Sequence, residues 1–206
     1  FMTSERDEFY YHENLIHVPG VAHPGLRRAL IVGGGDGGSA DELLKYPGIE
    51  RIVIAELDAK VVELSRRHLC EVHHGALDDP RVEIRIGDGM KYVHEEGPAA
   101  GERYDLIVLD PPAFAKHRAA LRNALKGYTR LNVKGLQRIK KGGILFTFSC
   151  SQVVTKDNFR NAVFTAAAQA GRKVRILHQL HQPADHPINI YHPEGEYLKG
   201  LVLYVE

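Results

Sequence analysis

Two short apolar stretches of the chain each run into a reactive side chain. One stretch, residues 104–109, is followed by Asp110, and the other ends at Phe148, two residues before Cys150. If both are strands of one parallel sheet, Asp110 and Cys150 emerge side by side at its carboxyl edge, where open α/β sheets bind ligands. A thiolate can add to an electron-poor ring while a neighbouring carboxyl exchanges a proton with it. The pair therefore predicts nucleophilic, covalent catalysis.

Cys150 also has a simpler interpretation, because buried cysteines most often act as small hydrophobic residues. Its position between two serines, with Asp110 on the adjacent predicted strand, favours the nucleophile, whereas Cys70 keeps the simpler interpretation. Pro111 and Pro112 remove two backbone donors and stiffen the loop, which would present its carbonyls to a flat ring.

A glycine-rich loop, residues 33–38, precedes a predicted helix. Glycines permit a tight turn and let backbone amides approach a ligand, and the helix amino end favours anions. Glu56 ends the second predicted strand and suits a ribose diol, while the Gly87-Asp88-Gly89 turn after the third suits an adenine amine. Together these strand ends predict an adenosyl site, with ligands Gly33, Gly35, Asp36, Gly37, Glu56, Asp88, Gly89 and Asp110.

Helix-period and strand-period segments alternate, which is typical of a parallel sheet with helices on both faces. We expect strands at Ala29–Val32, Ile52–Glu56, Val82–Ile86, Tyr104–Leu109, Gly143–Phe148, Val174–Leu180 and Tyr197–Val205. We expect helices at Ser39–Lys45, Ala59–Leu69, Met90–Glu95, Phe114–Lys140 with a break at Gly127, and Lys156–Ala170 capped by Thr155. No helix separates the last two strands, so the final strand can return antiparallel. Seven such strands resemble the Rossmann-like fold of class I S-adenosylmethionine-dependent methyltransferases.

Length and composition set limits on the chain. Its 206 residues, 44% of them hydrophobic, predict a single domain over residues 1–206. Two cysteines form no disulfide framework, no apolar run is long enough to span a membrane, and the acidic start differs from a signal peptide. We therefore expect a cytoplasmic protein. Histidines 178, 181, 186 and 192 lack partners at ligand spacing, so no metal site is predicted.

Charge divides the chain into two halves. Residues 1–100 hold 11 Lys and Arg against 18 Asp and Glu, and residues 101–206 hold 16 against 8. Cations recur at every fourth position of the helix predicted over residues 114–140, namely Arg118, Arg122, Lys126, Arg130, Lys134 and Arg138. Like charges at this spacing repel, and a bound polyanion relieves the repulsion. RNA contact is one interpretation, and a solvated face is the other.

Residues 5–95 resemble spermidine synthase, on the segments 7–13, 17–19, 33–38, 56–58, 78–82 and 87–89. The resemblance implies decarboxylated S-adenosylmethionine as cofactor, with methylthioadenosine as an alternative ligand. It also implies Asp36 near the aminopropyl amine, and Tyr11 and His12 near a polyamine. The family's Asp-Ser-x-Asp-Pro signature is absent, because this chain reads Asp110-Pro111-Pro112 at that point.

Residues 103–206 resemble the large-subunit ribosomal RNA cytosine-C5 methyltransferases, on segments 110–114, 127–128, 142–145, 148–151, 185–187 and 196–200. This resemblance implies S-adenosylmethionine, an RNA substrate, and catalysis by Cys150 and Asp110. Counting both resemblances, the predicted substrate-binding residues are Tyr11, His12, Pro111, Pro112, Phe114, Lys116, Arg118 and Arg122.

Three functions remain in contention. Cys150 with Asp110 favours RNA cytosine-C5 methylation, and Tyr11, His12 and Asp36 favour aminopropyl transfer to a polyamine. The family change near residues 95–101, where the charge also changes sign, suggests a chimera of two half-folds with a cofactor half, 1–100, and a catalytic half, 101–206. An engineered, inactive chimera is therefore the third interpretation. The oligomeric state stays open, with a homodimer among the alternatives.

Overall fold

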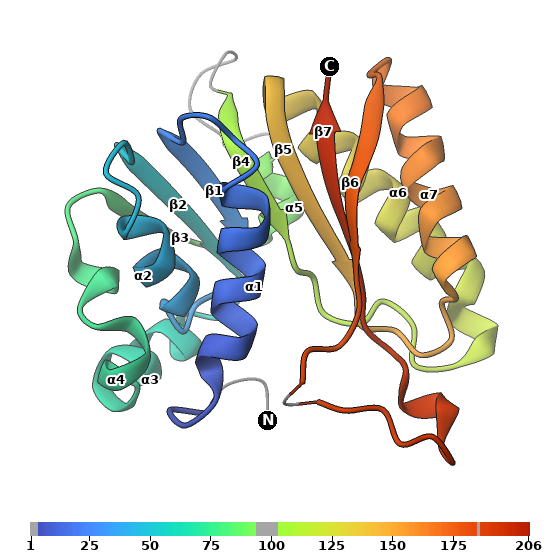
Figure 1. Cartoon of the computed structure of the whole chain (residues 1–206), viewed down its shortest axis with the longest axis horizontal. Coiled ribbons are helices and arrows are strands. Elements are labelled where there is room, and N and C mark those ends of the chain that lie inside the picture. Colours follow the sequence, from blue (N-terminus) through green and yellow to red (C-terminus); the bar gives the residue numbers. More distant parts are fainter. Residues whose placement is uncertain (1–3, 94–102, 185) are drawn as a thin grey trace.

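A computed structural model describes residues 4–93, 103–184 and 186–206. At its centre lies one seven-stranded sheet, with the strand order β3-β2-β1-β4-β5-β7-β6 (Figure 1). Its strands are β1 Arg28–Val32, β2 Arg51–Glu56, β3 Val82–Ile86, β4 Tyr104–Leu109, β5 Ile139–Ser149, β6 Val174–Leu180 and β7 Lys199–Val205. Strands β1 to β5 are parallel, and β7 is antiparallel to both β5 and β6. The predicted Rossmann-like class I methyltransferase fold is confirmed.

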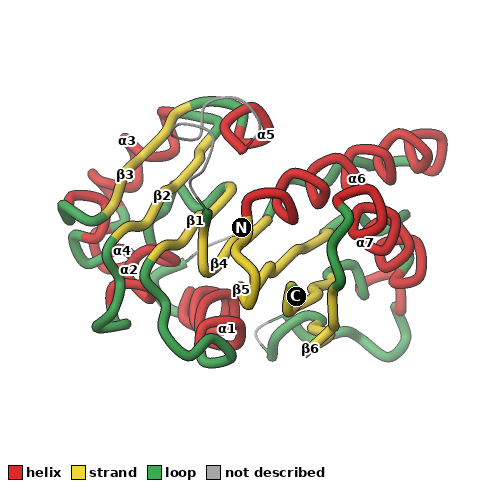
Figure 2. Tube along the Cα trace, turned by 90° about the horizontal axis from the view of Figure 1, so that it is seen from above, coloured by secondary structure: helices red, strands yellow, loops and turns green. Residues whose placement is uncertain are grey.

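Helices pack on both faces of the sheet (Figure 2). They are α1 Glu8–Gly20, α2 Gly38–Leu44, α3 Ala59–His68, α4 Cys70–His73, α5 Gly89–Lys91, α6 Leu121–Arg138 and α7 Lys156–Ala170. Apolar residues of α6 and α7 form a core on one face, and those of α1 and α2 form a core on the other. None of the helices described is long and apolar enough to cross a membrane.

The local sequence explains the central elements. Every residue of β4 is buried, which fits an almost wholly apolar strand between two helical layers. Helix α7 begins where the Thr155 hydroxyl accepts a hydrogen bond from the Asn158 amide at 3.1 Å, as the predicted cap requires. It ends at Gly171, whose left-handed conformation at φ 63° suits glycine.

The structure corrects several predicted boundaries. Helix α1 was not predicted, because its buried face includes His12 while Phe9 and Tyr10 are exposed, so no apolar period marks it. The helix expected over Phe114–Lys140 begins only at Leu121, after an irregular segment over residues 110–117 and a 3-10 turn, Arg118–Ala120. It continues unbroken through Gly127 and ends at Arg138.

Other boundaries differ by a few residues. In place of the predicted helix Met90–Glu95, residues 89–91 are α-helical and residues 92–93 continue as a π-helical turn. The last two predicted positions lie outside the described residues. The final strand begins at Lys199 rather than Tyr197. The expected junction at 95–101 also lies outside the described residues.

Candidate active site

The carboxyl edge of β4 and β5 brings the two predicted catalytic residues together. Leu109 on β4 pairs with Thr147 on β5, so Asp110 and Cys150 follow directly from adjacent strands. The two side chains interact electrostatically. The predicted juxtaposition of a carboxyl and a thiol is therefore present in the structure.

Helix α1 places a tyrosine on that carboxyl. The Tyr11 hydroxyl donates a hydrogen bond to Asp110 Oδ2. Burial raises the pKa of Asp110 to about 6; the bond from Tyr11 opposes the rise, and the charge on Asp36 adds to it. Burial and the Asp110 charge hold the pKa of Tyr11 well above its usual value, so Tyr11 remains a donor. Asp110 is thus a carboxyl that titrates just below neutral pH.

A buried imidazole joins two further carboxylates to this group. His12 Nδ1 bonds to the Glu8 carboxylate, and Nε2 lies 3.4 Å from Asp36 Oδ1. Burial lowers the pKa of His12, but the bonds and charges of Asp36 and Glu8 raise it above its usual value overall. With Asp110, three carboxylates thus face a single imidazole, so the cluster is anionic even when His12 is protonated. We call Glu8, His12, Asp36 and Asp110 the acidic cluster.

The glycine loop after β1 has the conformation that its composition predicts. Gly33, Gly34 and Gly37 adopt positive φ angles of 95°, 81° and 85°. A side-chain carbon at Gly38 would overlap the ring of His12, so a residue without Cβ lets α1 pack against the loop. The glycine loop therefore packs directly against the acidic cluster.

Glu56 is held at the tip of β2 by the backbone around it. Its Oε2 accepts a hydrogen bond from the Gly35 amide at 3.1 Å, and its Oε1 accepts one from the Asp58 amide at 3.1 Å. A Cβ at Gly35 would lie 2.8 Å from Glu56 Cγ, closer than real side chains approach. Asp88 lies exposed in the turn after β3. A fixed carboxylate, a glycine loop beside it and an exposed acid fit an adenosyl group.

The thiol of Cys150 lies beside a buried lysine that the sequence did not single out. Lys199 Nζ donates to the carbonyl oxygens of Ser151 at 2.7 Å and Val154 at 2.6 Å, which anchors the loop after Cys150. Burial lowers the pKa of Lys199 to about 8. Burial and the Asp110 charge raise the pKa of Cys150, while Lys199 opposes the rise. At a given pH, a smaller fraction of Cys150 is therefore ionised to the thiolate than of an ordinary cysteine.

The remaining predicted substrate residues lie on the loop after β4 and the start of α6. Pro111 is buried and Pro112 is exposed. Phe114 stacks on Tyr128, with ring centroids 4.6 Å apart, and so contributes to the core. Three exposed cations have no ion-pair partner among the described residues: Lys116, Arg118 and Arg122. Their predicted substrate contacts stay predictions.

Sequence reasoning missed Glu8 and Lys199 as parts of the site. Glu8 reaches His12 one helical turn away, and only the recognition of α1 as a helix could have paired them. Lys199 comes from β7, opposite Ser149 in an antiparallel pair whose register the sequence does not fix. Within the residues described, no group of His, Cys, Asp and Glu could hold a metal ion.

Comparison with known proteins places this chain in a family. Residues 8–177 match the spermine/spermidine synthase domain. The chain belongs to the spermine/spermidine synthase family. The chain is 44% identical over 147 residues to the polyamine aminopropyltransferase of Nitrosomonas europaea. This match covers 70% of the chain and 42% of that relative. The crystal structure of spermidine synthase from Thermotoga maritima has a TM-score of 0.71 and 26% identity, covering 99% of this chain and 61% of that one.

A second resemblance involves methyltransferases. The same chain is 36% identical over 158 residues to the ribosomal RNA large subunit methyltransferase I of Alteromonas mediterranea. This match covers 77% of the chain and 39% of that relative. The predicted two-part resemblance is thus confirmed. The chain spans less than half the length of either curated relative.

The same matches bear on the chimera interpretation. The synthase domain match spans residues 8–177 and so extends on both sides of residues 95–101. The two relatives match 70% and 77% of the chain, so their matched segments overlap rather than divide at a junction. A chimeric origin therefore stays a prediction.

Proposed function

We propose that this chain transfers an aminopropyl group from decarboxylated S-adenosylmethionine to an amine. The acidic cluster carries the proposal. Three carboxylates and one imidazole at the carboxyl edge attract an ammonium group and repel a carboxylate or a phosphate. Membership of the spermine/spermidine synthase family supports the same chemistry, and a polyamine is the acceptor that this membership suggests first.

In this reaction, separate residues bind the donor and accept the proton. Glu56 and the glycine loop would hold the ribose, Asp88 the adenine, and Asp36 the amine of the aminopropyl chain. When bound, the donor supplies a carbon activated by a sulfonium, with methylthioadenosine as the neutral leaving group. Asp110 accepts the proton that the attacking nitrogen loses as its bond to that carbon forms. The Tyr11 hydroxyl fixes the orientation of the Asp110 carboxyl.

One departure from the family pattern has a structural counterpart. The second acid of the Asp-Ser-x-Asp-Pro signature is replaced here by proline or alanine. Asp36 lies close enough to Asp110 to raise the pKa of its carboxyl. A pair of carboxylates therefore faces the reacting amine, although its second member comes from the glycine loop.

Calorimetric titration tests the choice of donor. Decarboxylated S-adenosylmethionine should bind at least tenfold more tightly than S-adenosylmethionine, because Asp36 repels the carboxylate that only the latter carries. The Asp36→Asn variant should reduce this ratio, whereas Asp157→Asn, on the exposed first turn of α7, should leave it unchanged. Equal affinities in the wild-type protein would contradict the proposal.

Cytosine-C5 methylation of RNA is the second candidate function, and the proximity of Cys150 to Asp110 favours it. Arg122, Lys126 and Arg130 are exposed on α6, whereas Arg138 donates to the Val93 carbonyl and is less available to a phosphate. The raised pKa of Cys150 counts against this function, because the thiolate is the nucleophile.

Covalent trapping separates the two candidates. If Cys150 adds to cytosine, RNA carrying 5-fluorocytosine should form an adduct with the wild-type protein at low salt, and with Cys70→Ala, but not with Cys150→Ala. Our first proposal expects no adduct from any of the three proteins. An adduct that depends on Cys150 would replace it with methylation.

A further inference from the structure

His12 faces carboxylates through both of its ring nitrogens. Its Nδ1 contacts the Glu8 carboxylate one turn earlier on α1, and its Nε2 lies 3.4 Å from Asp36 Oδ1 in the glycine loop. A neutral imidazole has one N–H group and one lone pair, so it can donate to only one of these carboxylates. The other nitrogen would direct its lone pair at a carboxylate oxygen. The geometry therefore fits an imidazolium, which donates from both nitrogens.

The ring is enclosed, so water does little to weaken these interactions. The side chain of His12 is 1% exposed, and that of Glu8 is 13% exposed. A Cβ at Gly38 would overlap the His12 ring, and the Gly38 amide donates to Asp36 Oδ1 at 3.1 Å, so the glycine loop is fixed against the ring. A buried cation is stable only when it is paired. Loss of either carboxylate would therefore favour loss of the ring proton.

Three elements bring polar or charged side chains to this ring. Helix α1 supplies Glu8 and also Tyr11, whose ring centroid lies 5.2 Å from that of His12. The glycine loop supplies Asp36, and the end of β4 supplies Asp110, which interacts electrostatically with His12.

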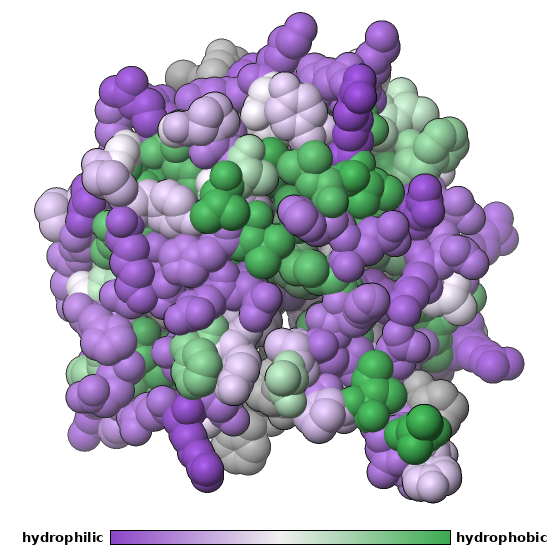
Figure 3. All heavy atoms as spheres, in the orientation of Figure 1, coloured by the Kyte–Doolittle hydropathy of each residue, from purple (hydrophilic) through white to green (hydrophobic). Residues whose placement is uncertain are grey.

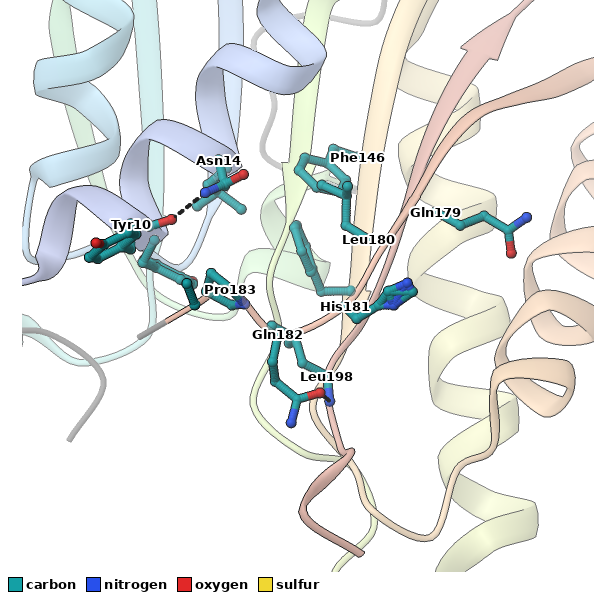
Figure 4. A pocket seen from close by; sticks show the side chains of 13 residues that line it. Tyr10, Asn14, Phe146, Gln179, Leu180, His181, Gln182, Pro183 and Leu198 are labelled. Atoms are coloured by element: carbon teal, nitrogen blue, oxygen red, sulfur yellow. Dashed lines mark hydrogen bonds between the residues drawn. The ribbon is translucent and has the colours of Figure 1, made fainter. Parts of the chain in front are cut away.

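The surface beside α1 adds no further charge. Hydrophobic residues reach the surface between this helix and β6 in the space-filling view (Figure 3). A cavity of about 450 Å³ lies between α1, β5 and the segment after β6 (Figure 4). Tyr11 lines this cavity but Glu8 and His12 do not, and none of the lining residues is Asp, Glu, Lys or Arg. Among the described residues, the carboxylates of the acidic cluster therefore set the charge of the ring.

The imidazolium in turn acts on the proposed catalytic carboxyl. Burial raises the pKa of Asp110 most strongly and the Asp36 charge adds to the rise, while the bond from Tyr11 and the charge of His12 oppose it. Glu8 contacts Nδ1 of the ring, whereas Asp36 faces Nε2. Loss of the Glu8 charge should therefore reach Asp110 through the charge of His12.

We propose that Glu8 is a positioning residue that holds His12 as an imidazolium beside Asp36 and Asp110, and so keeps Asp110 in the ionised form that a base needs. The role of Asp110 as a base rests on the proposed aminopropyl transfer. The link from Glu8 through His12 to Asp110 does not, because it follows from the contacts within the acidic cluster.

Glu8→Gln tests the link while keeping size and contact. Its amide can donate to Nδ1 of a neutral ring whose Nε2–H still faces Asp36, so only the cation is lost. Carbon NMR of labelled aspartate side chains should then show the pKa of Asp110 raised by roughly half a unit to one unit, because a nearby positive charge is gone. The pH of half-maximal methylthioadenosine release should rise by the same amount. Glu71→Gln, exposed on α4, is the control and should change neither.

A second substitution separates this link from a structural role. In His12→Gln no imidazolium is present, so adding Glu8→Gln should not raise the pKa of Asp110 further. Labelled histidine signals should also show His12 losing its proton at a lower pH in Glu8→Gln than in the wild-type protein. A pKa of Asp110 that Glu8→Gln leaves unchanged, lowers, or raises equally in the His12→Gln background would overturn the inference. If these NMR shifts occur but no methylthioadenosine is released, the link stands and aminopropyl transfer fails.

Discussion

Removal of one hydroxyl group should change the titration of the proposed catalytic carboxyl. In the Tyr11→Phe variant, Asp110 loses the hydrogen bond that favours its ionised form, while the burial that raises its pKa remains. Both the ring and its packing are kept. The pKa of Asp110 should therefore rise above its value of about 6 in the wild-type protein.

The magnitude follows from the type of hydrogen bond. A hydrogen bond to a charged group contributes about 1.5–3 kcal/mol, and about 1.4 kcal/mol corresponds to one pKa unit. Loss of the bond should thus raise the pKa of Asp110 by roughly one to two units. The carboxyl would then be largely protonated at neutral pH and would serve poorly as a base.

Carbon NMR of labelled aspartate side chains measures this pKa directly, with the Asp110 signal identified by its loss in Asp110→Asn. Tyr10→Phe is the matched control, because Tyr10 is 39% exposed and its hydroxyl makes no hydrogen bond among the described residues. It should leave the titration midpoint unchanged. A midpoint that stays near 6 or falls in Tyr11→Phe would refute the reasoning.

Three further outcomes are expected. Gly35→Ala should weaken methylthioadenosine binding in calorimetry at least tenfold, because its Cβ would displace Glu56, whereas Gly25→Ala, whose Cβ meets open space, should bind normally. Lys199→Met should lower the free energy of unfolding in urea by about 2–4 kcal/mol, because two loop carbonyls lose a charged donor; exposed Lys141→Met should not. Methylthioadenosine release should increase as pH rises through about 6, because Asp110 acts in its ionised form; a rate that falls over this range would exclude that role.

The sequence was sufficient for the sheet because its strands carry strong local signals. The apolar runs of β1 and β4 are buried on both faces, and the connection before β7 carries no helical pattern, which fits an antiparallel return. The adjacency of Asp110 and Cys150 followed from the same parallel order. Such features depend on chain order and on alternating segments, which can be read without tertiary contacts.

The sequence alone did not predict the parts of the site that depend on contacts between distant segments. The bond between Tyr11 and Asp110 spans 99 residues and depends on a helix whose buried face is partly polar. The cavity of about 450 Å³ also depends on tertiary structure, because its lining comes from α1, from β5 and from β6 with the segment that follows it. The start of α6 differs from the predicted one because residues 113–117 are irregular and Arg118–Ala120 form a 3-10 turn before the α-helix begins at Leu121.

Formation of methylthioadenosine tests the central claim most directly. The protein is supplied with decarboxylated S-adenosylmethionine and 1,4-diaminobutane, and methylthioadenosine and aminopropylated amine are quantified by mass spectrometry. Our account predicts equal amounts of the two products, and a loss of at least a hundredfold in Asp110→Asn with donor binding retained. A wild-type protein that binds the donor but forms no amine-dependent methylthioadenosine would contradict the account.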